Sequence, residues 1–274
     1  MSGPLPLSLC VITRDAARQI EGCLASVPFA GEIVVVDSGS RDDTVEVAHR
    51  SGARVLEHPW RGFGAQKNFA VAQARNDWVL CLDADERLTP ELGAAIVAAL
   101  AAKAGGAVPA GPAAYAMARR NRFLGRWLAH GEGYPDWNAR LFDRRRARWT
   151  DDSVHEHVVA DTPIARLAGD LLHDSAESLD AYMAKQNRYT TLQAEALHAR
   201  GVRAGAAQLV LSPSVRFVRF YVIKLGFLDG IAGLVHIAIG CFNSFMKYAK
   251  LRAIAQAGPA ARAPVAGRVE GGDR

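Results

Sequence analysis

Two carboxylates stand two residues apart at the end of an apolar run. Asp83 and Asp85 directly follow Leu80-Cys81-Leu82. Carboxylate oxygens are the ligands that Mg²⁺ and Mn²⁺ prefer, and phosphate oxygens can complete the coordination shell. A D-x-D triplet alone recurs by chance in turns, but turn polarity does not require a carboxylate pair at the end of an apolar strand. The pair predicts a divalent-metal site that assists the departure of a diphosphate.

A third aspartate ends another apolar run. Asp37 follows Ile-Val-Val-Val at positions 33–36 and precedes Ser38-Gly39-Ser40. A carboxylate here can accept hydrogen bonds from uracil or ribose, and the glycine allows a ligand to approach the backbone closely. The alternative is a plain turn with Ser40 as a helix cap. That alternative leaves a carboxylate at the end of a fully apolar strand unexplained.

The first hundred residues alternate apolar runs with segments of helical periodicity. Strands are predicted over residues 7–13, 32–37, 53–57 and 77–82. Helices are predicted over 14–26, 40–50 and 64–75, and from a cap at Thr89. Such alternation predicts parallel βαβ units, in which ligands bind beyond the carboxyl ends of the strands. Asp37 and Asp83 are therefore expected to face one crevice.

The pattern changes after a loop rich in Gly, Ala and Pro at 105–112. Strands are predicted over 113–122, 138–144, 155–159 and 164–173, then a helix over 178–200 and a mostly apolar segment from Pro213 to about 251. These boundaries predict a catalytic domain at 1–175, with a donor half at about 5–105 and an acceptor half at about 113–175. A helical region follows at 176–252, and then a disordered tail at 257–274.

Bulk composition narrows the class of protein. Half of the 274 residues are hydrophobic and the net charge is +5, which favours anionic partners without choosing among them. The four cysteines lie far apart without metal-ligand spacing, as expected for reduced thiols in the cytosol. The first residues lack the basic and apolar regions of a signal peptide. No nucleic-acid-binding module is recognisable, so nucleic acid is not an expected partner.

Four blocks in the first half together resemble family 2 of the inverting glycosyltransferases. They are Ser8–Arg14, Val34–Thr44, Gly64–Asn68 and Leu82–Glu86. Later blocks at Tyr134–Trp137, Arg140–Phe142, Val154–Glu156 and Gly226–Gly230 resemble the branch that includes lipopolysaccharide core β-1,4-glucosyltransferases acting on heptose. The resemblance covers about residues 5–252. It implies an α/β fold of the GT-A type, with a Rossmann-like, mostly parallel central sheet, helices on both faces and a C-terminal helical extension.

The same resemblance assigns roles on the donor side. Asp85 would bind Mg²⁺ or Mn²⁺ directly, Asp83 would contact the ribose or the metal-bound shell, and Asp37 would contact the nucleoside. Lys67, at the start of a helix, would add positive charge beside the diphosphate. Its alternative is a solvated helix start. The nucleotide-sugar set is then Arg14, Asp37, Ser38, Lys67 and Asp83.

An inverting transfer also needs a base that deprotonates the acceptor hydroxyl. The sequence lacks the Glu-Asp pair that many family members carry in the second half of the domain. Glu156 and Asp152 are the candidates, with Glu156 preferred, although a carboxylate beside His155 could be structural. Asp136, Arg140 and His155 are expected to shape the acceptor pocket.

Two features suggest an anionic, lipid-linked acceptor. The arginine clusters at 119–126 and 144–148 are either solvated or in contact with acceptor phosphates. The apolar segment at 217–248 is flanked by basic residues, and its longest charge-free stretch, 230–246, falls short of the roughly 20 residues that cross a bilayer. A peripheral element on the inner membrane surface is predicted, with packing against the catalytic domain as the alternative.

The predicted function is inverting transfer of a sugar, expected to be glucose from UDP-glucose, to a lipopolysaccharide inner-core or related lipid-linked saccharide. The enzyme is expected in the cytoplasm, peripheral on the inner face of the membrane. One alternative is transfer to polyprenyl phosphate or another polysaccharide acceptor. Another is a non-catalytic protein that binds sugar nucleotides or membranes, against which the intact set of Asp37, Asp83 and Asp85 argues.

Overall fold

The computed structural model describes residues 3–102, 111–150, 156–175 and 178–257. The chain divides into two units. Unit 1 contains residues 1–129 and 133–175, and unit 2 contains residues 130–132 and 176–274. The predicted tail at 257–274 lies, beyond Ala257, outside the described residues.

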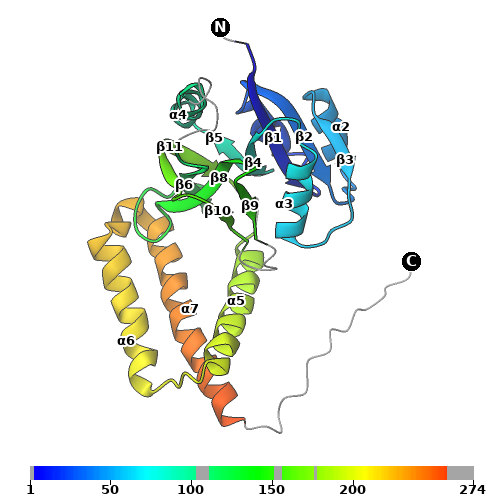
Figure 1. The fold of residues 1–274 in the computed structure, drawn as a ribbon. Coiled ribbons are helices and arrows are strands. Elements are labelled where there is room, and N and C mark those ends of the chain that lie inside the picture. Colours follow the sequence, from blue (N-terminus) through cyan, green and yellow to red (C-terminus); the bar gives the residue numbers. More distant parts are fainter. Residues whose placement is uncertain (1–2, 103–110, 151–155, 176–177, 258–274) are drawn as a thin grey trace. The chain divides into compact units, whose positions relative to one another are not determined.

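Unit 1 is built on a nine-stranded sheet (Figure 1). Along the sheet the order is β3-β2-β1-β4-β8-β6-β11-β5, with β7 paired to β6. The strands are β1 (Leu5–Thr13), β2 (Ala30–Asp37), β3 (Arg54–Glu57), β4 (Trp78–Asp83), β5 (Glu86–Leu88), β6 (Ala114–Phe123), β7 (Arg126–Trp127), β8 (Asp136–Asp143) and β11 (Ala165–His173). Along this order only β8 and β5 oppose the common direction, so the predicted mostly parallel sheet is confirmed.

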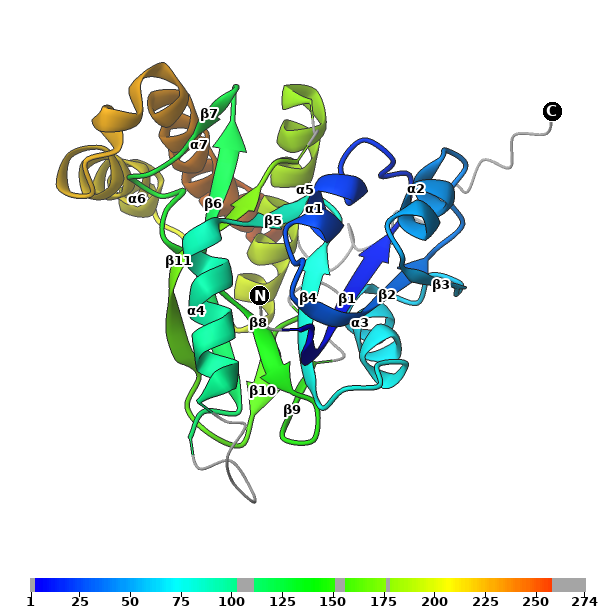
Figure 2. The same cartoon turned by 90° about the horizontal axis from the view of Figure 1, so that it is seen from above.

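Side chains that alternate along β1 enter different cores on the two faces of the sheet. Leu7, Leu9 and Val11 join the core beneath α1 (Ile20–Ala25), α2 (Thr44–Arg50) and α4 (Pro90–Ala101). Cys10 and Ile12 join the core beneath α3 (Phe63–Ala72) and the small sheet of β9 (Ala147–Trp149) and β10 (Val158–Ala160). Figure 2 shows α4 beside β11, with which it makes contact. Helices therefore cover both faces, as predicted.

The sheet curls so that β5, the last strand of the sheet order, begins close to the end of β4 in the middle of that order. β5 begins at Glu86, three residues after β4 ends at Asp83, yet it lies at the far end of the strand order. β5 pairs antiparallel with β11, and Glu86 stands opposite His173. This closure brings the end of β11 beside the Asp83–Glu86 segment.

Two predicted helix starts differ from the structure, and one is confirmed. Thr89 caps α4, since its hydroxyl accepts the N–H of Leu92 at 3.3 Å. Ser40 is not a cap, because α2 begins at Thr44 and the Ser40 hydroxyl instead accepts the N–H of Asp15 at 2.9 Å. The helix predicted from residue 14 begins only at Ile20, because Asp15 adopts a left-handed backbone conformation with φ of 50°.

Unit 2 consists of helices. They are α5 (Leu179–Ala199), α6 (Ala206–Phe217), the π-helix η1 (Val218–Ile223), the 3₁₀-helix η2 (Gly226–Asp229) and α7 (Gly230–Gln256). α6 begins before Pro213, so that proline lies inside a helix and does not open the segment. Residues 226–256 are long and apolar enough to cross a membrane by length and composition only, which extends the segment beyond the charge-free stretch 230–246.

Unit 2 also holds a short piece of the connection between β7 and β8. The buried Asp229 accepts the His130 N–H at 2.8 Å, and its other oxygen lies 3.0 Å from the His130 Nδ1. The Gly131 N–H donates to the Lys224 carbonyl at 2.9 Å, and Arg216 Nε donates to Glu132 Oε2 at 3.0 Å. The connection that leads into β8 is therefore anchored among the helices of unit 2.

Glu32 ties β2 to three other segments of unit 1. Its carboxylate accepts hydrogen bonds from Ser8 Oγ at 2.6 Å, Arg75 N–H at 2.7 Å and Arg54 Nη2 at 3.0 Å. Burial raises the pKa of Glu32, but these hydrogen bonds outweigh burial and hold the pKa below its ordinary value. The ionised carboxylate therefore stabilises the fold above the unfolded-state pKa, and this stabilisation is lost as pH falls through the folded-state pKa.

We expect Glu32→Gln to lower the free energy of unfolding by about 1.5–3 kcal/mol at pH 7. The difference from the parent protein should shrink as pH falls below about 4, since both side chains are then uncharged. Urea unfolding at several pH values measures it. Glu57→Gln, at an exposed glutamate on the neighbouring β3, is the matched control and should change little. A constant difference between pH 7 and pH 3 would contradict the assignment.

Candidate active site

Asp83 is held between two buried cations at the carboxyl end of β4. Its Oδ1 lies 3.1 Å from Lys67 Nζ and its Oδ2 lies 2.8 Å from Arg140 Nη2. The Lys67 and Arg140 side chains are only 4% and 5% exposed. Burial raises the pKa of Asp83, but the charges of Arg140 and Lys67 outweigh it and hold that pKa well below its usual range. Asp83 is therefore ionised at any physiological pH.

These contacts continue into a row of alternating charges. The fully buried Glu86 accepts from Arg140 Nη2 at 2.6 Å and lies 3.7 Å from Arg119 Nη1. Beyond them, Arg119 donates to Asp136 at 2.7 and 2.9 Å, and at the other end Lys67 Nζ lies 3.0 Å from Glu156 Oε1. The row, called the charge row below, is Asp136, Arg119, Glu86, Arg140, Asp83, Lys67 and Glu156. Four carboxylates against three cations leave it with a formal charge of −1.

Trp149 of β9 covers the middle of the charge row. Its ring lies 4.6 Å from Lys67 Nζ and 5.5 Å from the Arg140 guanidinium carbon, both suited to cation–π attraction. Trp149 is itself 2% exposed, so it excludes water from the two cations. Low local polarity strengthens the attraction of both cations to Asp83.

Asp85 points to a partner that the sequence did not single out. Its Oδ2 lies 3.2 Å from His173 Nε2, and the two side chains are 26% and 23% exposed. His173 Nδ1 lies 2.8 Å from Asn121 Oδ1, to which it donates, so Nε2 is the ring nitrogen that faces Asp85 and that a cation would contact. Neighbouring ligands of an octahedral ion at ~2.1 Å lie about 3.0 Å apart, so the pair fits one divalent cation.

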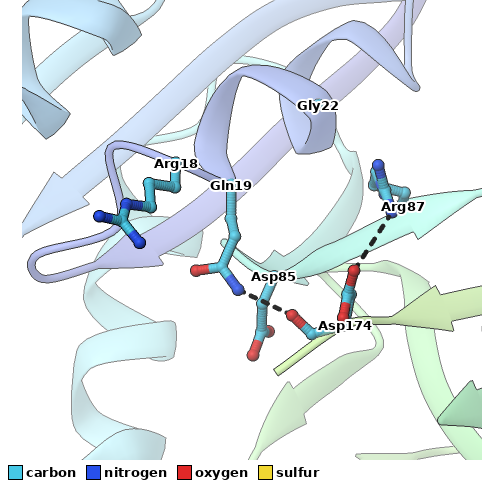
Figure 3. A pocket seen from close by; sticks show the side chains of 6 residues that line it. All are labelled: Arg18, Gln19, Gly22, Asp85, Arg87 and Asp174. Atoms are coloured by element: carbon cyan, nitrogen blue, oxygen red, sulfur yellow. Dashed lines mark hydrogen bonds and ion pairs between the residues drawn. The ribbon is translucent and has the colours of Figure 1, made fainter. Parts of the chain in front are cut away.

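The open side of Asp85 borders a small pocket of about 110 Å³. Figure 3 shows Gln19, at the start of α1, pointing toward Asp174, whose backbone oxygen accepts its amide at 2.7 Å. Arg18 and Arg87 also line this pocket, and Arg87 lies 3.8 Å from the Asp174 carboxylate. Among the described residues no three potential metal ligands converge, so Asp85 and His173 could hold a cation only with phosphate or water oxygens completing its shell.

Asp37 lies at the same sheet edge as Asp83. Asp37 pairs with Thr13 of β1 and Asp83 pairs with Ile12, so a single strand separates the two carboxylates. The Asp37 side chain is buried and accepts the N–H groups of Gly39 at 2.9 Å and Ser40 at 2.8 Å. The carboxylate therefore shapes the turn that presents Ser38.

The other predicted nucleotide contacts lie nearby. Ser38 Oγ accepts a hydrogen bond from Gln66 Nε2 at 2.9 Å, and Gln66 is fully buried on α3 next to Lys67. Arg14, directly after β1, is exposed and lies 3.6 Å from the Asp15 carboxylate. One helix thus connects the turn after β2 to the charge row.

A larger cavity of about 330 Å³ lies among β8, β9, β10 and β11 of unit 1. Glu156, Trp149, Trp137 and Asn138 line it, and the Arg166 guanidinium lies 4.5 Å above the Trp137 ring. The predicted acceptor residues Asp136 and Arg140 are instead engaged in the charge row. Asp152 and His155 lie outside the described residues.

The model of glycosyl transferase family 2 matches residues 8–164, more than half of the chain. The chain belongs to glycosyl transferase family 2. It is 30% identical to the lipopolysaccharide core biosynthesis glycosyltransferase LpsC of Rhizobium meliloti (strain 1021), over 90% of this chain and 92% of that one. It is 31% identical to an uncharacterized glycosyltransferase of Rickettsia bellii (strain RML369-C), over 93% and 90% of the two chains.

A solved structure of mannosyl-3-phosphoglycerate synthase from Rubrobacter xylanophilus is 18% identical, with a TM-score of 0.44 over 71% of this chain and 74% of that one. The predicted family and enzyme class are confirmed by the family match and the relatives. This family 2 enzyme is a glycosyltransferase built on a mostly parallel sheet with helices on both faces.

In this family 2 enzyme, Lys67→Met would leave Asp83 and Glu156 without their shared cation. Removing one partner of a buried ion pair costs about 3–5 kcal/mol, because the remaining charge stays buried. We expect a loss of that size in the free energy of unfolding, and Asp83→Asn in the same chain should restore about 1 kcal/mol or more of it. Urea unfolding measures both. Lys185→Met, at an exposed lysine of α5, is the control. If the losses in free energy of unfolding caused by Lys67→Met and by Asp83→Asn simply add in the double variant, Lys67 and Asp83 do not depend on each other.

Proposed function

We propose that this enzyme transfers glucose from UDP-glucose, with inversion, to a saccharide of the lipopolysaccharide inner core. The observation that carries the proposal is the Asp85–His173 pair, placed beside the ionised Asp83 at the carboxyl edge of the sheet. The relative LpsC, whose name places it in lipopolysaccharide core biosynthesis, supports the class of acceptor.

Asp85 Oδ2 and His173 Nε2 would hold Mg²⁺ or Mn²⁺. When bound, the cation would neutralise charge on the departing diphosphate as a Lewis acid. Asp83 already has a cation within 3.1 Å of each oxygen, so its proposed role is to fix Lys67 and Arg140 and to face the ribose. Asp37, Ser38 and Arg14 would surround the nucleoside.

Glu156 is the proposed base. It lines the 330 Å³ cavity, and its contact with Lys67 ties the acceptor side to Asp83 on the donor side. The Lys67 ammonium, 3.0 Å from Glu156 Oε1, would hold this carboxylate in place for proton abstraction. Trp137 and Arg166 offer an aromatic face and a cation to a sugar that carries negative charge. The acceptor is proposed to be lipid-linked, which would place the enzyme in the cytoplasm on the inner membrane surface.

Glu156→Gln should lower kcat about 10²–10⁴-fold while leaving the KM for UDP-glucose nearly unchanged, because general-base catalysis contributes a factor of that size. The measurement is UDP release with UDP-glucose, Mn²⁺ and truncated core lipopolysaccharide. Asp152→Asn is the matched comparison and should keep most of the activity. A large loss of kcat in Asp152→Asn with little change in Glu156→Gln would make Asp152 the base. If no UDP-sugar or GDP-sugar protects the protein against thermal unfolding, the proposal that the enzyme binds a sugar-nucleotide donor is contradicted.

A further inference from the structure

An apolar stripe on unit 2 faces away from its core. Leu211, Val215, Val218 and Val222 follow one another at spacings of four, three and four residues along α6 and η1, which places them on one helix face. Their exposed fractions are 59%, 63%, 50% and 52%. A helix face that packed on protein would bury these side chains.

The apolar surface continues around the following turn. The large apolar side chains that remain at least 45% exposed there are Ile223, Leu225, Phe227, Leu228 and Ile231. Beside them, Val215, Val218 and Ile223 line an apolar groove of about 570 Å³ that Arg219 and Lys224 also line. Soluble monomers rarely expose contiguous apolar patches larger than a few hundred Å², so this surface, called the apolar patch below, indicates a binding face.

The charged residues of α6, η1, η2 and α7 are almost all positive, and one of them, Arg216, is paired with Glu132 of the β7–β8 connection. Residues 206–256 contain the basic residues Arg216, Arg219, Lys224, Lys247, Lys250 and Arg252. Asp229 is the one acidic residue in this range, and it is buried against His130. Apolar side chains flanked by exposed Arg219 and Lys224 match the acyl region and the anionic headgroups of a bilayer surface.

α7 is less suited than α6 and η1 to be surrounded by lipid. It contacts both α5 and α6, and its buried face consists largely of small residues such as Ala232, Gly233, Gly240 and Ser244. A methyl group on Gly233 or Gly240 would lie within 2.6 Å of neighbouring atoms, so these contacts are close. One face of α7 therefore packs closely against neighbouring helices.

We propose that α6, η1 and η2 form a membrane-binding element that lies in the plane of a bilayer rich in anionic phospholipid. The inference rests on the proposed function, since a lipid-linked acceptor lies in such a bilayer. The same element anchors His130–Glu132 through Asp229 and Arg216. That segment leads directly into β8, which carries Trp137 and Arg140, so the chain joins the membrane element to the acceptor side of the site.

The test uses the full chain and sedimentation with vesicles of phosphatidylcholine, with and without phosphatidylglycerol. The parent protein should bind vesicles that contain phosphatidylglycerol, and Val215→Glu/Val222→Glu should weaken binding at least 10-fold. Both side chains are exposed, so the fold should persist. Leu192→Glu, at an exposed leucine of α5, is the matched control and should bind as the parent does. Arg219→Gln/Lys224→Gln should lower affinity and remove most of its salt dependence.

Three results would overturn the inference. The first is that the parent protein binds neither kind of vesicle. The second is that Val215→Glu/Val222→Glu binds vesicles as the parent does. The third is that light scattering shows a dimer for the parent and a monomer for that variant. The last result would make the apolar patch an interface between copies. Turnover of delipidated, water-soluble core oligosaccharide separates the two proposals. The double glutamate variant should retain this turnover. If the parent protein shows no turnover but still binds vesicles, the result counts against the transferase proposal and leaves the membrane proposal standing.

Discussion

The burial of Lys67 and Arg140 beneath Trp149 is the constraint on which the rest of the site depends. Two cations that are almost inaccessible to water require carboxylates at contact distance, and Asp83, Glu86 and Glu156 supply them. Asp83 ends β4 and Glu86 begins β5, whereas Glu156 precedes β10. The ion pairs therefore fix the end of β4 relative to α3, β8 and the segment before β10.

The curled sheet adds the second half of the arrangement. Because β5 follows β4 after a two-residue turn but pairs with β11, His173 must lie beside Asp85. The two carboxylates of the D-x-D segment therefore have different partners. Asp83 faces inward to the buried cations, and Asp85 faces the more exposed side, where it lies beside His173.

Much of the donor side could be predicted from the sequence because it depends on local pattern. Apolar runs that end in Asp37 and Asp83 predict strands, and parallel strands bring their carboxyl ends to one edge. The role of Lys67 is implied by the resemblance of the block Gly64–Asn68 to the family, not by local pattern. Glu86 and His173 were not identified, since their roles arise from strand pairing across 87 residues of chain and from the curl of the sheet. Glu86 directly follows the D-x-D segment, which was the available signal.

Long-range partners also account for the roles that sequence could not assign. Arg140 carries no local sign that its guanidinium is buried against Asp83 and Glu86. Ser40 has the residue type of a cap, but its hydroxyl donates to the Asp37 carboxylate and accepts the Asp15 N–H, and the helix begins later. In unit 2 the apolar composition was visible, whereas the face it presents depends on how α5, α6 and α7 pack.

The proposed site assigns the metal to Asp85 and His173 and leaves Asp83 with Lys67 and Arg140. Pulsed electron paramagnetic resonance of Mn²⁺ bound with UDP tests this assignment, because a coordinated imidazole nitrogen produces a resolved coupling. We expect a single imidazole coupling that disappears in His173→Gln and persists in Asp83→Asn. A spectrum without nitrogen coupling, or one that loses Mn²⁺ in Asp83→Asn but not in Asp85→Asn, would contradict it.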